Sequence, residues 1–341
     1  MTIVHLQVVI PGVVAQLRTT HDQDNSSSNL PVIEHFLEHG RCTQLWQADD
    51  LSHARVDSWQ QSLLYALPRE VRHFGAASAQ LTWLGEGGQS QAGSCFQITP
   101  VHFQVGLDDV RCLMPPPLSG EEAQAIFENL KPLVSSTGFR VCELSSDDGK
   151  NWYLWCDSEL KINTFSLKNL AQSRLFNLMP QGADASVLRR LMTEVQMLLH
   201  GHPINQQRER QGILPVNALW FHGHAAVKQL THSMKSVVVS NSAYVKGLSS
   251  GLDLQCLDFA SEIQSLLSLN EEKVLLVLPE QSLNSIDAQW FKGLHAALVR
   301  RQINRLDIYL DNWQVSLLGG RWAQLRRRLQ GKRQVIKDYF S

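Results

Sequence analysis

The last third of the sequence alternates apolar runs with amphipathic segments, and this pattern constrains the fold most. The strand candidates are residues 236–239, 273–278 and 306–310, and the helix candidates are 259–267, 286–300 and 322–330. Strands that alternate with helices are typical of parallel βαβ units. An apolar run at Val4–Ile10 predicts a buried first strand. We therefore expect an α/β core with a mostly parallel sheet flanked by helices.

The middle of the chain follows a different pattern. Residues 96–105 and 110–114 predict one strand pair, and 139–144 and 151–156 predict another. Ser119 is a candidate N-cap for a helix to about Val134 between them. Hairpins of this kind favour an α+β part inserted into the core. We expect a discontinuous core formed by residues 1–80 and 213–341 and an inserted subdomain over 81–212.

Composition limits the functional class. The chain has 341 residues and a formal net charge of -1, which argues against nucleic acid as a partner. Six cysteines are scattered without a C-x-x-C pair, as expected of reduced thiols in a cytoplasmic protein. We find no secretory leader in the first residues and no apolar run long enough to span a membrane.

The segment from Glu194 to His224 is the most informative polar stretch. A predicted helix over 183–200 ends there, a loop follows, and a strand is predicted over 214–221. Ligand groups in α/β sheets gather beyond the carboxyl ends of strands. The candidate ligand-binding residues are Glu194, His200, His202, Asn205, Arg208, Asn217, His222 and His224.

Each residue type in this segment suits a chemical role. Arg208 could hold a phosphate or carboxylate through two parallel hydrogen bonds, with Asn205 and Asn217 fixing the orientation of the anion. The pairs His200/His202 and His222/His224 also permit a metal site, although no carboxylate ligand accompanies them clearly. The alternative is structural, because such residues often cap helices or bond to buried backbone groups.

The same residues carry a resemblance to a known family. Glu194–Arg208, Gly212 and Leu214–Trp220 resemble a bacterial group of phosphoglycerate-mutase-like regulatory proteins of the RpfE type, and so does Thr99–Val105 with the following Asp108. More distantly, His202–Arg208 and Pro215–Trp220 are similar to archaeal-type cofactor-independent phosphoglycerate mutase. That family belongs to the alkaline-phosphatase superfamily, so the resemblance implies an alkaline-phosphatase-like fold.

The resemblance implies a two-metal site that this sequence lacks. Mutase chemistry needs two divalent metals held by Asp and His and a serine nucleophile. The first strand here ends in Ile10-Pro11-Gly12, where the family has an aspartate. Glu280 follows a later strand without the expected histidine, and Asp311 lacks the companion histidine of the family's last metal pair.

Two functional hypotheses follow, and the sequence leaves open whether the protein is an enzyme. The first is a degenerate mutase-like protein without a metal or other cofactor, which binds an anionic small molecule or a protein partner in a regulatory role. The alternative is an active metal-dependent phosphatase or mutase with a rearranged histidine-rich site. A basic run over 321–337 suggests a third idea, a surface for an acidic partner; a solvated helix face is the stronger explanation of this run.

Overall fold

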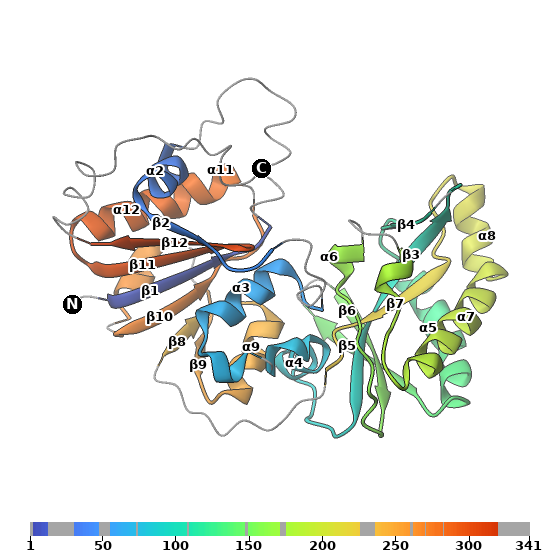
Figure 1. Cartoon of the computed structure of the whole chain (residues 1–341). Helices are drawn as coiled ribbons and strands as arrows, with labels where there is room; N and C mark the ends of the chain where they lie inside the picture. Colours follow the sequence, from blue (N-terminus) through green and yellow to red (C-terminus); the bar gives the residue numbers. More distant parts are fainter. Residues whose placement is uncertain are drawn as a thin grey trace. The chain divides into compact units, whose positions relative to one another are not determined.

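The computed structural model describes residues 3–12, 31–47, 55–72, 74–107, 109–146, 149–170, 175–225, 236–259, 262–269, 271–281 and 283–319. The chain divides into two compact units (Figure 1). Unit 1 comprises residues 1–53, 58–72 and 230–341, and unit 2 comprises 54–57 and 73–229. The proposed limits of independently folding domains at 80/81 and 212/213 stay a prediction.

Unit 1 is built on a seven-stranded sheet in the order β2-β12-β11-β1-β10-β8-β9. The strands are β1 (Ile3–Ile10), β2 (Arg41–Gln44), β8 (Val237–Val239), β9 (Gln255–Leu257), β10 (Lys273–Val277), β11 (Ile303–Leu310) and β12 (Trp313–Leu318). β1 is parallel to both β10 and β11, β8 is parallel to β10 and β9, and β12 and β2 are antiparallel additions at one edge.

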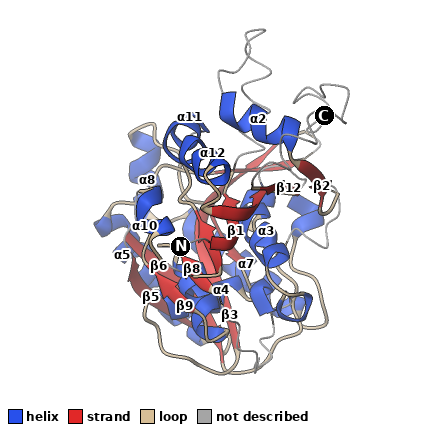
Figure 2. Ribbon diagram, turned by 90° about the vertical axis from the view of Figure 1, so that its left-hand side faces the viewer, coloured by secondary structure: helices blue, strands red, loops and turns tan. Residues whose placement is uncertain are grey.

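Helices cover both faces of this sheet (Figures 1 and 2). They are α2 (Pro31–His39), α3 (Ser58–Ala66), α9 (Ala243–Gly251), α10 (Ile263–Leu267), α11 (Leu283–Ile286) and α12 (Lys292–Val299), with a 3-10 turn η2 (Arg69–Val71) and a π-helical turn η5 (Asp287–Phe291). Leu6, Val8 and Ile10 of β1 are fully buried on the face packed by α2, η5 and α12. The alternation of strand residues thus selects one strongly apolar face.

Unit 2 holds a second, antiparallel sheet, formed by β3 (Ser94–Val105), β4 (Val110–Leu113), β5 (Arg140–Ser146), β6 (Gly149–Cys156) and β7 (Ala218–His222). β3 pairs with β4, β6 and β7, and β5 pairs with β6. The other elements are η3 (Phe74–Ala76), α4 (Ser78–Gly85), α5 (Gly120–Ser135), α6 (Leu167–Leu170), η4 (Leu175–Leu178), α7 (Ala185–His200) and α8 (Pro203–Arg210). The buried residues of α5 and α7 share one core with the sheet.

The predicted elements match the structure closely in most places. The helices expected over 31–39 and 119–134 are confirmed, and Ser119 forms a capping box with Glu122. The loop expected around Pro203 is wrong, because those residues form α8, and the strand expected from Leu214 begins only at Ala218. Asp184 does not cap α7 with its side chain; its Oδ2 accepts the Lys161 N–H instead, at 2.8 Å. The helix expected over 322–330 lies outside the described residues.

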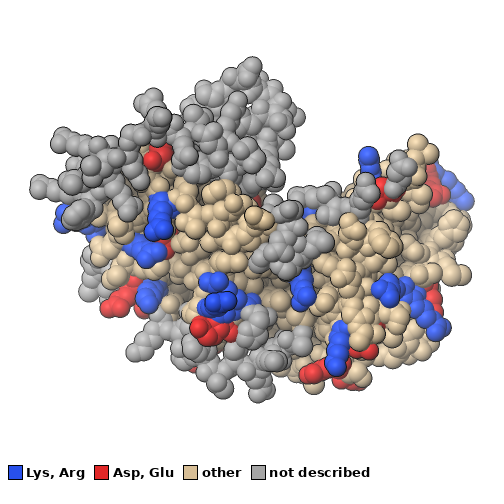
Figure 3. Space-filling model, in the orientation of Figure 1, with Lys and Arg blue, Asp and Glu red and all other residues tan. Residues whose placement is uncertain are grey.

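Two surface features bear on partners. Within the described ranges, no helix has both the length and the hydropathy to cross a membrane. On the face drawn in Figure 3, basic and acidic side chains lie interspersed among the described residues, and neither sign covers that face.

Candidate functional site

The predicted segment 194–224 connects α7, α8 and β7 in unit 2. His202 lies directly before α8 and acts as its N-cap, with Nδ1 accepting the Ile204 N–H at 3.3 Å. β7 then pairs antiparallel with β3, placing His222 opposite Gln97 and Trp220 opposite Thr99. The two parts of the sequence that carry the family resemblance therefore meet where β3 pairs with β7.

Arg208 is buried and its guanidinium is bonded to protein groups. Nη1 lies 3.1 Å from both carboxylate oxygens of Glu122, Nη2 donates to the Pro116 carbonyl at 2.7 Å, and Nε donates to the Leu214 carbonyl at 3.1 Å. Its side chain is 2% exposed. Burial alone would raise the pKa of Glu122, but hydrogen bonds from Ser119 and Arg208 hold it below its usual value. Arg208 thus ties α8 to the start of α5.

Both predicted asparagines bond to the backbone. Asn205 Nδ2 donates to the carbonyls of Leu199 and Val216 at 2.8 and 2.6 Å, and its Oδ1 accepts the Val216 N–H at 2.9 Å. Asn217 accepts from the Phe103 N–H at 2.7 Å and donates to the Phe103 carbonyl at 3.0 Å. Asn205 fixes the loop before β7, and Asn217, which directly precedes β7, extends its contact with β3 by one residue.

The three bonded histidines of the segment have different partners. Nε2 of His202 lies 2.9 Å from Asn129 Nδ2, Nε2 of His222 lies 3.0 Å from Thr99 Oγ1, and Nε2 of His224 lies 3.0 Å from the Leu160 carbonyl. Burial lowers the pKa of all three rings, to about 4 for His222. These rings favour the neutral form and bond to three different parts of unit 2.

The remaining two candidates lie on α7. Glu194 forms an i,i+4 ion pair with Arg190 at 2.8 Å, and the Arg190 side chain is 79% exposed. His200 is exposed at the last position of the helix. The eight residues are close together in the sequence. In the structure, most of their polar atoms form hydrogen bonds or ion pairs with other protein groups. A ligand-binding role for them stays a prediction.

The carboxyl edge of the unit 1 sheet is the second candidate location. Gly12 follows β1 with a φ of 72°, and a Cβ at that position would lie 3.0 Å from Glu280 Oε1. The Glu280 carboxylate therefore lies next to Gly12, directly after the end of β1.

Asp311 lies at the same edge, in the two-residue turn between β11 and β12. Its φ of 45° is unusual for a residue with a side chain, and Asp and Asn tolerate it best. Its Oδ1 accepts the hydroxyl of Ser58 at 2.6 Å, and its backbone carbonyl accepts the hydroxyl of Ser62. Sequence patterns did not indicate the two serines, because they belong to α3, far from Asp311 along the chain.

The described residues of this edge do not form a site for a pair of divalent metals. The sequence indicated two carboxylates at this edge, Glu280 and Asp311. The Asp311 carboxylate already accepts a hydrogen bond from the Ser58 hydroxyl. Among the described residues, no group of three or more His, Cys, Asp or Glu side chains is arranged to hold a metal ion.

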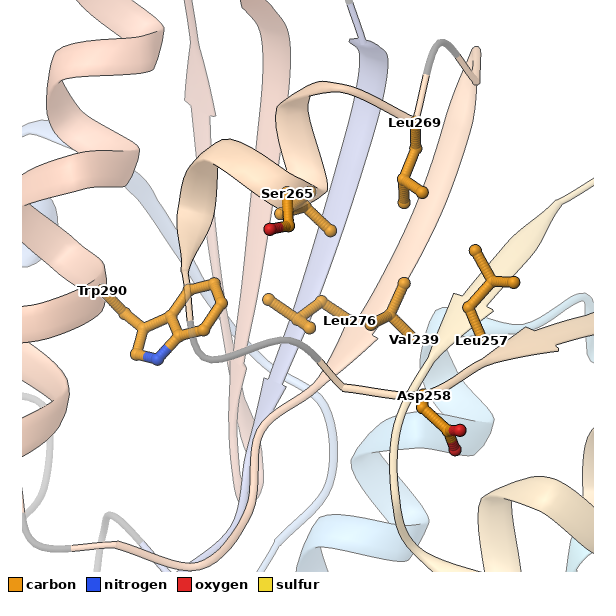
Figure 4. A pocket seen from close by; sticks show the side chains of 8 residues that line it. Val239, Leu257, Asp258, Ser265, Leu269, Leu276 and Trp290 are labelled. Carbon is orange, nitrogen blue, oxygen red and sulfur yellow. The ribbon is translucent and has the colours of Figure 1, made fainter.

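A small apolar pocket lies near the carboxyl ends of β8, β9 and β10 (Figure 4). Its volume is about 60 Å³. The lining residues are Val239, Leu257, Asp258, Ser265, Leu266, Leu269, Leu276 and Trp290. Trp290 comes from the π-helical turn η5, a type of distortion that is frequent at functional sites. The pocket can hold only a small apolar group.

Comparisons with known proteins support the resemblance found in the sequence. No family model matches the chain. A curated 2,3-bisphosphoglycerate-independent phosphoglycerate mutase from Methanothrix thermoacetophila is 23% identical over 142 residues, which cover 38% of this chain and 36% of that protein. The match thus spans about a third of the curated relative.

Two solved structures align over nearly the whole chain. The PH0037 protein from Pyrococcus horikoshii covers 94% of this chain and 88% of its own, with 13% identity and a TM-score of 0.50. A cofactor-independent phosphoglycerate mutase from Thermoplasma acidophilum covers 93% and 90%, with 15% identity and a TM-score of 0.41, too low to support a conclusion.

The predicted fold and the predicted similarity are confirmed. The chain has a mixed α/β, alkaline-phosphatase-like fold with a mostly parallel central sheet, and it is similar to cofactor-independent phosphoglycerate mutases. Assignment to the RpfE-type group stays a prediction.

Proposed function

We propose that this chain is a degenerate phosphoglycerate-mutase-like protein that acts by binding and not by two-metal phosphoryl transfer. The observation that carries this proposal is the structure of the carboxyl edge of the unit 1 sheet. There the Asp311 carboxylate accepts the Ser58 hydroxyl at 2.6 Å, and Glu280 packs against Gly12. Side chains that bond to one another at this edge stabilise the fold and compete with any incoming metal.

The proposed role is regulatory, through an anionic small molecule or a protein partner. Similarity to a mutase supports an ancestry in which the fold bound phosphorylated molecules. Within 194–224, Glu194 and His200 lie on the outer part of α7, whereas an anion at Arg208 would have to displace Glu122. We also propose the reducing cytoplasm as the location, because the six cysteines are scattered along the chain without a C-x-x-C pair.

The alternative is an active metal-dependent phosphatase or mutase with a rearranged site. It would need His202, His222 and His224 to leave their present partners and converge. Their neutral rings are the form that binds metals, which is the one feature that favours this alternative.

Turnover and metal content distinguish the two proposals. The purified full chain is assayed for phosphoglycerate mutase activity and for hydrolysis of p-nitrophenyl phosphate, with manganese, zinc or magnesium added and after treatment with a chelator. We expect no metal-dependent turnover and no stoichiometric metal. Turnover that a chelator abolishes and added metal restores would refute the binding role.

Two variants locate any activity that does appear. Loss of turnover in Asp311→Asn, with His222→Gln unaffected, would place the reaction at the carboxyl edge of the unit 1 sheet. The opposite result would place it at the histidine-rich segment. Thermal unfolding of both variants shows whether a loss of turnover reflects a loss of structure.

A further inference from the structure

Three basic residues form one row across the centre of the unit 1 sheet. His5 of β1 is the direct partner of Lys273 in β10 on one side and of Arg305 in β11 on the other. Residues paired directly on parallel strands point to the same face of the sheet, and neighbouring strands are about 4.8 Å apart. The three side chains therefore stand in line over a span of roughly 10 Å.

One buried carboxylate organises this row. Asp307 is 1% exposed, and its Oδ2 lies 2.7 Å from His5 Nε2 and 2.9 Å from Arg305 Nη2, while Oδ1 accepts from Arg305 Nε at 3.3 Å. Burial alone would raise the pKa of Asp307, but hydrogen bonds from His5, Ser316 and Arg305 lower it, so the carboxylate stays charged. A charged carboxylate fixes both basic side chains in orientation.

The row keeps an excess of positive charge. Asp307 balances one cation, and Arg305 and Lys273 supply two before His5 is counted. Lys273 is exposed and forms no ion pair with any residue that the structure describes. The Arg305 side chain is 49% exposed, and Nη1 is not among its atoms bonded to Asp307. Lys273 and Arg305 flank His5 and have one carboxylate between them, so this arrangement favours a counter-anion.

We propose that Lys273, His5 and Arg305 form a binding site for the phosphate group of a small molecule. The Arg305 Nη1 and the Lys273 ammonium would donate to the phosphate oxygens. His5, with Nε2 held by Asp307, presents Nδ1 to the same anion. Nδ1 would accept a hydrogen bond from the hydroxyl of a monoprotonated phosphate, or donate a hydrogen bond to the phosphate when the ring is protonated.

This site is separate from the carboxyl edge discussed under the proposed function. Arg305 lies near the start of β11, whereas Asp311 follows its end. The inference goes beyond the proposed regulatory role by naming a ligand class and a location. Binding here is measured without reference to turnover, so either proposal can fail while the other stands.

The experiment follows the imidazole signals of His5 by NMR while inorganic phosphate or phenyl phosphate is added to the full chain. Sodium chloride at equal ionic strength corrects for screening. The His5 signals are identified as those that are missing from the spectrum of the His5→Gln variant. We expect saturable shifts with both phosphates and a dissociation constant at least tenfold higher in Lys273→Ala, with partial recovery in Lys273→Arg.

Lys292→Ala is the matched control, because Lys292 is an exposed lysine of unit 1 on α12 and not in the row. It should bind phosphate like the natural chain. Shifts that do not saturate, that chloride reproduces, or that Lys273→Ala leaves unchanged would overturn the proposal. Binding of phenyl phosphate but not inorganic phosphate would also overturn it, because the phosphate group would then not be what is recognised.

Discussion

Replacing Arg208 with alanine tests most directly whether the polar segment 194–224 serves structure or ligand binding. The substitution removes the buried partner of Glu122 and leaves the carbonyls of Pro116 and Leu214 without their donors. Breaking a buried ion pair from one side costs about 3–5 kcal/mol. Glu122 keeps some contact with water, its side chain being 21% exposed, which favours the lower end of that range.

Urea denaturation of the full chain measures this cost. We expect the free energy of unfolding of unit 2 to fall by about 3 kcal/mol. For a unit of this size, that change lowers the melting temperature by roughly 6–12 °C. The control is Arg190→Ala, which breaks an Arg–Glu pair on the exposed surface of α7 and should cost less than about 0.5 kcal/mol. If both variants are equally stable and only Arg208→Ala loses affinity for phosphate, the structural interpretation of Arg208 is refuted.

Two further predictions test local features of unit 2. The pKa of His222 lies at about 4, below its unfolded value, so the unfolded chain takes up the proton first. Stability should fall as the pH decreases from about 6.5 to 4, by up to about 3 kcal/mol, and His222→Gln should flatten this part of the curve; parallel curves for the two proteins would contradict the assignment. Gly93 has a φ of 100°, and a Cβ there would collide with the Cys156 carbonyl, whereas Gly87 has a φ of 87° and open space around it. Denaturation should therefore show a loss of several kcal/mol for Gly93→Ala and only about 1–2 kcal/mol for Gly87→Ala, and equal losses would contradict the predicted collision.

Periodicity predicted the fold well where elements are long and one face is apolar. The helix α7 is an example, with Leu188, Leu191 and Val195 buried along one side. The βαβ alternation of the last third likewise gave the parallel core of unit 1. These patterns work because burial of a continuous apolar face dominates the stability of such elements.

Short or polar elements escaped prediction for the opposite reason. α8 has almost no apolar stripe, and its only sequence cues are Pro203 at the first turn and His202 before it. The edge strand β2 and its neighbour β12 alternate polar and apolar residues over a few positions, which also describes many loops. β12 forms by pairing with β11, and β2 forms by pairing with β12, a contact between residues distant in sequence.

The candidate residues of 194–224 show why a high density of polar residues is ambiguous. After the last turn of α8, residues 214–217 lead to β7 without regular secondary structure, so their backbone groups lack helical or strand partners. Buried groups of this kind must be bonded by side chains or water. Asn205, Arg208 and Asn217 meet that need, and the sequence cannot show it because their partners include Phe103 and Pro116 from distant strands and loops.

A net charge that no protein group balances indicates a ligand site better than a high density of polar residues does. Arg208 is a cation matched by Glu122, so its burial already accounts for it. The row of His5, Lys273 and Arg305 instead carries more positive charge than Asp307 balances, and the side chains of Lys273 and Arg305 keep contact with water. Sequence alone could not reveal this row, since its members are separated by more than 260 and 30 residues and meet only through strand register. A buried and balanced charge stabilises the fold, whereas an exposed and unbalanced group of charges lowers its free energy further when an anion binds.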